Sequence, residues 1–195
     1  DGELSERSAK MSKSLGNTVS PEEMIEKFGA DTVRLFILFA ANPTAGMDWS
    51  DSALEANYRQ MVQLYNMPET ILSWNGNARE IDTWMIARLK QRCQQWQDAM
   101  DSYDLRGAVD ASHFDLVKDL NWYRRRGGEN PEIGKEILRV WTHMISIATP
   151  HIAEDWWKMM GNDDLVAGRV FELPDQLTSA EKDALDAETY LRAFL

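Results

Sequence analysis

Five consecutive residues near the start of the chain, Lys10-Met11-Ser12-Lys13-Ser14, combine cationic and hydroxyl side chains. A lysine ammonium is a compact positive charge, and serine hydroxyls and exposed backbone N–H groups can donate further hydrogen bonds to a phosphate. The nearby Gly16 and the small serines keep such a loop flexible enough to close over a ligand. Side chains of these types are able to bind a phosphate. The alternative is a solvated lysine and serine loop that binds no ligand.

A second basic group lies in the middle of the chain, where Trp122 and Tyr123 directly precede three arginines. Two interpretations stay open. The basic side chains can contact the backbone of an RNA, or the arginines can form the cationic last turn of a helix, where the helix dipole favours them. The candidates for RNA binding are Lys118, Arg124, Arg125 and Arg126.

The residue types that usually hold metals or form disulfides are sparse. Cys93 is the only cysteine, which excludes an intramolecular disulfide and a cysteine-based zinc site and agrees with a reducing compartment. His113, His143 and His151 fall on separate predicted helices, with no cysteine or carboxylate at metal-ligand spacing. We predict structural roles for the three histidines and no metal site.

Two short helices are predicted after the first basic segment. Residues 1–19 lack a sustained apolar period and are expected to form a loop. Ser20-Pro21-Glu22-Glu23 then combines an N-cap serine, a proline at the first helical position and a glutamate three residues after the serine. Gly29 ends this helix, Asp31 can cap the next one, and the second helix is expected to end at Asn42-Pro43.

The middle of the chain is predicted to be a helix bundle. Apolar residues recur there at steps of three and four, and the short connections between such segments favour antiparallel neighbours. The fold class is therefore all-α: a helical bundle preceded by a loop and short connector helices. The expected bundle helices run from Asp51 to about Leu72, over Met85–Met100, over Leu105–Tyr123, over Pro131–Ala148, and from Pro150 to near Gly161.

The last part of the chain has a weaker pattern. Val170 to Leu173 is a candidate for a short extended piece, and Thr178-Ser179-Ala180-Glu181 is a capping box for a final helix. We expect three units: residues 1–50 as loop and connector, 51–162 as bundle, and 163–195 as a C-terminal appendage. The proline-bounded loops at 42–43 and 149–150 are the expected joints.

Composition limits the classes of protein to consider. The chain has 195 residues, of which 44% are hydrophobic and 27% charged, as in a soluble globular protein with one sizeable core. It contains no apolar run of membrane-spanning length and no signal-peptide pattern, so no membrane association and a cytoplasmic location are expected. The net charge of −11, taken alone, argues against a nucleic-acid partner. Residues 163–195 carry much of the excess, however, so a local RNA contact at the arginines stays possible.

The first basic segment matches the KMSKS signature of class I aminoacyl-tRNA synthetases without a mismatch, and Leu15-Gly16-Asn17 continues the match. Residues 21–23, 28–35 and 49–51 resemble, in order and spacing, the stretch that follows the signature in the leucine, valine and isoleucine enzymes. Residues 150–157 resemble a late bundle segment of the same subgroup. Residues 119–126, with a Trp-Tyr pair before arginines, look like the bundle helix of archaeal-type leucine enzymes. The resemblance covers residues 10–162.

The resemblance implies a chemistry for the loop. Amino-acid activation attacks the α-phosphate of ATP and expels pyrophosphate, so negative charge grows on the β- and γ-phosphate oxygens as the bond breaks. Lysines placed there stabilise the transition state more than the ground state. By resemblance, Lys13 is the first candidate for this contact and Lys10 the second. The implied ATP-binding residues are Lys10, Met11, Ser12, Lys13 and Ser14.

The resemblance also implies a layout and partners. Residues 1–50 would be the signature loop with the stem-contact connector, and 51–162 the anticodon-binding bundle. No His-Ile-Gly-His motif of the nucleotide-binding fold occurs, and the chain opens at Asp1 without a methionine. We therefore expect a piece of a longer enzyme that is inactive alone and binds no cofactor. The intact enzyme would use leucine, ATP with Mg²⁺, and tRNA(Leu).

Three other interpretations remain at this point. In the first, the chain derives from a valine or isoleucine enzyme of the same subgroup. In the second, it is a stand-alone tRNA-binding module whose loop is a relic. A helical scaffold for protein partners is the third, and no residue pattern specifically favours it.

Overall fold

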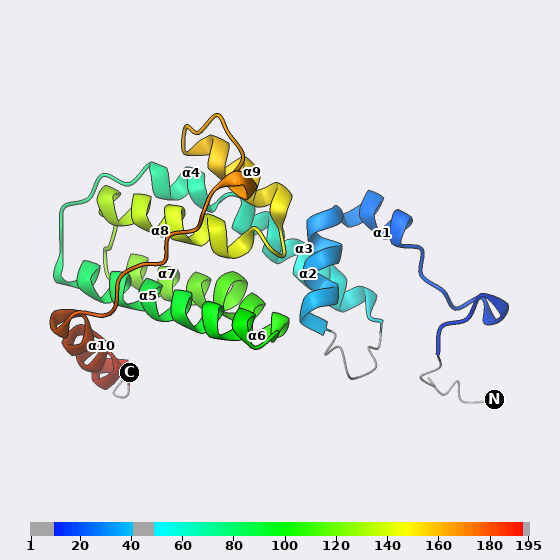
Figure 1. The fold of residues 1–195 in the computed structure, drawn as a ribbon, viewed down its shortest axis with the longest axis horizontal. Helices are drawn as coiled ribbons and strands as arrows, with labels where there is room; N and C mark the ends of the chain where they lie inside the picture. Colours follow the sequence, from blue (N-terminus) through cyan, green and yellow to red (C-terminus); the bar gives the residue numbers. More distant parts are fainter. Residues whose placement is uncertain (1–9, 41–48, 193–195) are drawn as a thin grey trace.

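The computed structural model describes residues 10–40 and 49–192, and no β-strand occurs among them. Helices and short loops make up the described chain, so the predicted all-α class is confirmed. Figure 1 shows a helical bundle at one end, two connector helices in the middle and the N-terminal loop at the opposite end. No helix in the described ranges is both long and apolar enough to cross a membrane.

The connector begins with α1 (Pro21–Phe28), which starts where the sequence predicts. The Oγ of Ser20 accepts a hydrogen bond from the backbone N–H of Glu23 at 3.4 Å. Gly29, with φ of 82°, ends the helix in a backbone region that favours glycine. The second connector helix, α2 (Ala30–Ala40), follows at once. Its predicted end at Asn42-Pro43 lies outside the described residues.

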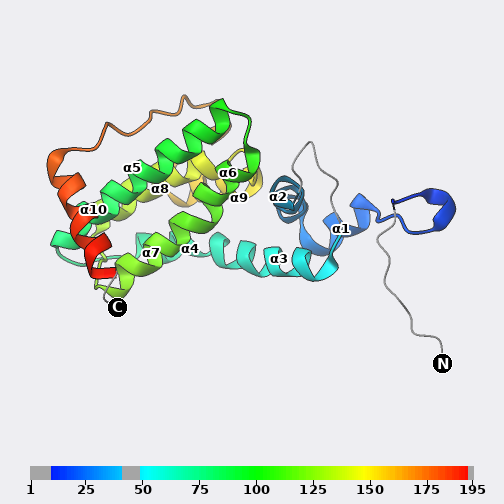
Figure 2. The ribbon, with the colours of Figure 1, turned by 90° about the horizontal axis from the view of Figure 1, so that it is seen from below.

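Helix α3 (Asp51–Tyr65) leads from the connector into the bundle, as Figure 2 shows. Ser50 caps it, because its Oγ accepts the N–H of Ala53 at 3.2 Å. The prediction of one helix from Asp51 to Leu72 is wrong, since α3 ends at Tyr65 and a separate helix, α4 (Met67–Leu72), follows. Pro68 lies in the first turn of α4 and has no N–H to continue the hydrogen-bond ladder of α3.

The bundle is organised around the long helix α5 (Glu80–Asp101), which contacts the helices on either side of it. Its packed neighbours include α7 (Leu116–Arg125) and α8 (Pro131–Ile145), and α9 (Pro150–Met159) packs against α8. One continuous core fills the space between these elements. Its largest fully buried side chains include Trp141, Trp156, Tyr123, Met85, Leu89, Leu116, Leu120 and Ile137.

The third predicted bundle helix is interrupted by a wider turn. Helix α6 (Leu105–Val109) passes into a π-helical segment, η2 (Asp110–Asp115), before α7 begins. Two carbonyls of this segment bond to other elements. Trp141 Nε1 of α8 donates to the carbonyl of Ser112 at 2.7 Å, and Gln60 Nε2 of α3 donates to the carbonyl of His113 at 3.0 Å. These side chains satisfy backbone acceptors within the wider turn.

The C-terminal part folds back over the bundle. Glu154 of α9 holds the short 3-10 segment η3 (Val166–Gly168), because its carboxylate accepts the N–H of Val166 at 2.9 Å. The predicted extended piece at 170–173 forms no strand. The predicted capping box of α10 (Ser179–Arg192) is confirmed, with reciprocal hydrogen bonds between Thr178 and Glu181. Glu181 also forms an ion pair of 2.8 Å with Lys90, which fixes α10 on α5.

Candidate ATP loop and nucleic-acid interface

The N-terminal basic segment forms a closed turn rather than an extended strand of chain. A 3-10 turn, η1 (Lys13–Leu15), is stabilised by a bond of 3.1 Å from the N–H of Leu15 to the carbonyl of Ser12. Asn17 closes the loop. Its Oδ1 accepts the N–H of Ser12 at 2.7 Å, and its Nδ2 donates to the carbonyl of Lys10 at 3.3 Å.

Asn17 was not among the residues predicted to bind ATP. Its signal in the sequence was the continuation of the motif as Leu15-Gly16-Asn17, which extends the match by three residues. A short amide side chain can bond to backbone groups on both sides of a tight turn. The structure therefore adds Asn17 as a residue that shapes the loop.

The loop carries its candidate phosphate-binding groups on an exposed surface. Lys10 is exposed, and the hydroxyls of Ser12 and Ser14 lie 2.7 Å apart, within hydrogen-bond distance. Lys13 occupies the first position of the 3-10 turn, and its side chain lies outside what the structure describes. The loop projects away from the bundle (Figure 1), so it does not share one site with the arginines.

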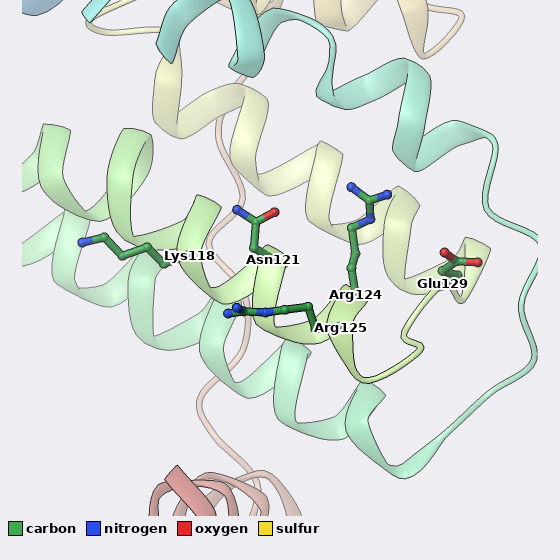
Figure 3. Close-up of a pocket in the computed structure, with 5 residues that line it drawn as sticks. All are labelled: Lys118, Asn121, Arg124, Arg125 and Glu129. Carbon is green, nitrogen blue, oxygen red and sulfur yellow. The ribbon is translucent and has the colours of Figure 1, made fainter. Parts of the chain in front are cut away.

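The second basic group forms an open cavity on α7. Figure 3 shows Asn121 and Arg124 pointing to one side of the helix while Lys118 and Arg125 extend along it. Lys118 keeps 73% of its side chain exposed although its Nζ lies 2.9 Å from Asp115 Oδ1. The cavity has a volume of about 580 Å³ and is lined by Lys118, Asn121, Arg124, Arg125 and Glu129.

Arg126 has a different environment from the other three basic candidates. Its Nε lies 2.9 Å from Glu188 Oε1 of α10, and its guanidinium lies 4.2 Å from the centre of the Trp122 ring. Trp122 Nε1 also donates to Glu188. Arg126 therefore attaches α10 to the bundle and is not in the cavity.

Helix α7 is held on α5 by two buried carboxylates, Asp119 of α7 and Asp82 of α5. Asp119 accepts from Arg88 at 3.1 Å and from Arg92 at 2.8 Å, and Tyr123 donates its hydroxyl to Asp82 at 2.6 Å. Because these residues anchor one face of α7, the opposite face presents Arg124 to solvent. Tyr123 therefore packs in the core while Arg124 and Arg125 of the same helix stay exposed, so core packing and RNA contact are compatible in this segment.

The predicted structural role of the histidines agrees with the position of His113. Its ring is fully buried, and its two nitrogens lie 2.8 Å from Ser112 Oγ and 3.0 Å from Thr149 Oγ1. Burial without a charged partner lowers the pKa of His113 to about 3. Thr149, expected at a joint, is itself buried, so the 149–150 connection is packed into the bundle.

Cys93 also lies in the core, and desolvation raises its pKa to about 11. A buried thiol with a raised pKa is unreactive as a nucleophile. Within residues 10–40 and 49–192, no group of three or more His, Cys, Asp or Glu side chains is placed to hold a metal ion.

Comparison with known protein families gives two matches along the chain. The family described as "Anticodon-binding domain of tRNA ligase" matches residues 82–192. The family described as "tRNA synthetases class I (I, L, M and V)" matches residues 4–50 and therefore includes the loop. The first of these matches covers more than half of the chain.

Similar curated proteins are named leucine–tRNA ligase. Those of Archaeoglobus fulgidus and Methanothrix thermoacetophila are 33% and 32% identical to this chain, and each alignment covers 98% of it. The chain spans about 20% of the length of these relatives. A crystal structure of a LeuRS–tRNA–LeuAMS ternary complex from Agrobacterium radiobacter K84 shares the fold. Its TM-score is 0.67 at 23% identity, over 90% of this chain and 23% of that one.

Proposed function

The chain belongs to the family of anticodon-binding domains of tRNA ligases, and from this premise we propose that it is part of a leucine–tRNA ligase. The observation that carries the proposal is the presence, in one chain, of the signature loop and this helical bundle. The relatives that align with nearly the whole chain bear the name leucine–tRNA ligase, which favours leucine over valine or isoleucine.

In this proposal the intact enzyme forms leucyl-adenylate from leucine and ATP and then transfers the leucyl group to tRNA(Leu). The loop of residues 10–14 contacts the ATP phosphates. Lys13 is the first candidate, and Lys10 the second, for placing positive charge against the oxygens of the departing pyrophosphate, where negative charge grows in the transition state. The bonds from Asn17 to Ser12 and Lys10 hold the loop in the compact shape that this contact requires.

In this proposal the magnesium ion that accompanies ATP is bound through the ATP phosphates and is not assigned to residues of this chain. The donors near the loop are lysine and serine side chains, which suit phosphate oxygens better than a divalent cation. No step of the reaction is therefore assigned to a metal held by these residues.

The tRNA contact is assigned to the open face of α7. Lys118, Arg124 and Arg125 are exposed and line one cavity, as phosphate-binding side chains need to be. Arg126 adds positive charge close by, although its guanidinium is engaged by Glu188. Asn121 is exposed in the same cavity, and its side-chain amide is a neutral hydrogen-bonding group beside the cations.

We retain the division into residues 1–50 as signature loop and connector, 51–162 as tRNA-binding bundle, and 163–195 as appendage as part of the proposal. Charging of tRNA for protein synthesis implies a cytoplasmic location.

The catalytic assignment is tested in the full-length protein by leucine-dependent pyrophosphate exchange. Lys13→Ala should lower the exchange rate by at least about 100-fold, the scale seen when one transition-state donor is lost. Lys135→Ala is the matched control, because Lys135 is a lysine on α8 with 67% of its side chain exposed. An unchanged rate in Lys13→Ala would remove Lys13 from the mechanism. Exchange supported by valine or isoleucine but not leucine would reassign the enzyme.

The tRNA assignment is tested with the 195-residue chain alone. We expect it to bind tRNA with an affinity that falls as salt rises, and to show no leucine-dependent exchange. Arg124→Gln together with Arg125→Gln should reduce the dependence of the affinity on salt. Absence of binding even at low salt would reject this face as the tRNA contact. Exchange by the chain alone would show that the active site is complete within it.

A further inference from the structure

The connector and the bundle meet at the start of α9, where the usual helix cap is missing. The first N–H groups of a helix need acceptors from outside the helix. Thr149 occupies the N-cap position of α9, yet it makes no capping hydrogen bond. Its hydroxyl instead donates to the carbonyl of Ile145 at 3.1 Å and lies 3.0 Å from His113 Nε2.

Asp31 of α2 supplies the missing acceptor from 121 residues earlier in the chain. Its Oδ2 accepts the backbone N–H of Ile152 at 2.8 Å, and its Oδ1 lies 2.8 Å from His151 Nδ1. The carboxylate is 7% exposed, whereas the His151 side chain is 74% exposed. The sequence-based expectation that Asp31 caps its own helix is therefore wrong. Asp31 lies inside the first turn of α2 and caps α9.

A carboxylate in this place has a clear electrostatic reason. The N-terminal end of a helix carries partial positive charge, and a carboxylate that accepts its free N–H groups is stabilising there. Hydrogen bonds to an ionised acceptor are stronger than neutral ones and depend on direction. The contact consequently constrains how the first turn of α9 lies against α2.

The other contacts between connector and bundle are less directional. Near the opposite end of α2, the Phe39 ring lies 4.7 Å from the Phe114 ring, and the guanidinium of Arg106 lies 4.9 Å from the Phe39 ring. The hydrophobic driving force is non-directional, whereas a hydrogen bond depends on the alignment of donor and acceptor. Asp31 and Phe39 thus lie near the two ends of α2, with the fully buried Leu35 between them in the bundle core. Among the side chains of α2 that the structure describes, Asp31 is the one with short hydrogen bonds to α9.

We propose that Asp31 is a positioning residue that sets the orientation of the tRNA-binding bundle relative to the connector and its ATP loop. The inference rests on the proposed function. Amino-acid activation needs the loop but not the tRNA, whereas transfer needs the bound tRNA to reach the active site. Small misplacements of reacting groups cost large factors in rate, so a loosened joint should affect transfer selectively.

The kinetic test compares the two half-reactions in the full-length protein. Asp31→Ala should leave leucine-dependent pyrophosphate exchange within about twofold of the parent and lower kcat/KM for tRNA in aminoacylation about tenfold or more. His151→Ala removes one of the two partners and should cause a smaller loss. Glu55→Ala is the matched control, because Glu55 is an exposed carboxylate of the neighbouring helix α3, and it should change neither reaction.

A second measurement reports on the joint without any catalysis. Labels on Glu26→Cys in α1 and Lys135→Cys in α8 allow the distance between connector and bundle to be measured by spin-label spectroscopy. Both positions are exposed, while the native Cys93 is buried. Asp31→Ala should broaden the distance distribution, and Glu55→Ala should not.

Each outcome decides the proposal. Selective loss of transfer together with a broadened distribution supports it. An equal loss in both half-reactions, or an unchanged distribution, overturns it. If Asp31→Ala fails to fold, Asp31→Asn replaces it. Its amide oxygen can still accept the Ile152 N–H but carries no charge, so a smaller selective loss of transfer and a smaller broadening are expected, and no change in either readout overturns the proposal. A parent protein with no leucine-dependent exchange would refute the proposed function alone, since the distance measurement would still test the joint.

Discussion

The buried histidine His113 should make the chain unstable in mild acid, and replacing it should remove that dependence. In the folded chain its ring is fully buried and its pKa is lowered to about 3, so it stays neutral in mild acid. In the unfolded chain its pKa returns to about 6.5. As the pH falls from 6.5 toward 3, the unfolded state therefore binds a proton that the folded state does not. The free energy of unfolding must fall over this window.

The size of the effect follows from these two pKa values. At pH 7 the difference is about 0.2 kcal/mol, because the histidine is mostly neutral in both states. At pH 5 the proton on the unfolded chain costs the folded state about 2 kcal/mol, and near pH 3 the loss approaches about 4 to 5 kcal/mol. A loss of 2 kcal/mol is a large part of the stability of an ordinary domain.

The assay is urea-induced unfolding of the parent and of His113→Gln at pH 7 and pH 5. His113→Gln should be less stable at pH 7, because the bonds to Ser112 and Thr149 are altered, but its further loss at pH 5 should be about 2 kcal/mol smaller than that of the parent. Thr142→Val is the control, since it removes the buried hydroxyl bond to Leu138 without removing a titrating group. Equal pH dependence in parent and His113→Gln would refute the reasoning.

Three further predictions concern the loop, the core and α10. Asn17→Ala should raise the KM for ATP in pyrophosphate exchange several-fold with an unchanged melting temperature; an unchanged KM would show that the closed turn is not needed. Gly134→Ala should lower the free energy of unfolding in urea by about 1 to 3 kcal/mol, because the added Cβ would lie 2.8 Å from Ile71 Cγ2 and 2.9 Å from Trp74 Cε3; full stability would contradict this packing. Glu188→Gln should weaken the attachment of α10, seen as faster proteolysis there, and strengthen tRNA binding by releasing Arg126, whereas weaker binding would count against that role.

Local signals in the sequence located most helix boundaries correctly. Ser20 with Pro21 marked the start of α1, and Thr178 with Glu181 marked the start of α10, because each cap is formed by residues close together in the chain. The end of α3 was missed. Pro68 was present in the sequence, but the apolar pattern around it suggested a continuous helix.

Contacts between distant residues could not be found in the same way. Asp31 was assigned to its own helix, since nothing near it in the sequence reveals that α9 lacks a cap 121 residues later. The sequence located the basic cluster but did not reveal that its arginines have different environments. Arg126 pairs with Glu188, while Arg124 faces the cavity, and only the position of α10 makes this distinction. Both cases depend on tertiary packing rather than on local preference.

The π-helical segment η2 also determines which residues α7 presents to solvent. Each residue of an α-helix turns the chain by about 100°, and a π turn accommodates one residue more than an α turn. The extra residue at 110–115 thus sets the rotational phase of everything after it, with Asp119 and Tyr123 directed at the core and Arg124 and Arg125 outward. A chain one residue shorter here would form a regular helix, yet its arginines would be turned about a quarter of the way around. Insertions and deletions at this point would therefore change the charged surface without altering a single basic residue.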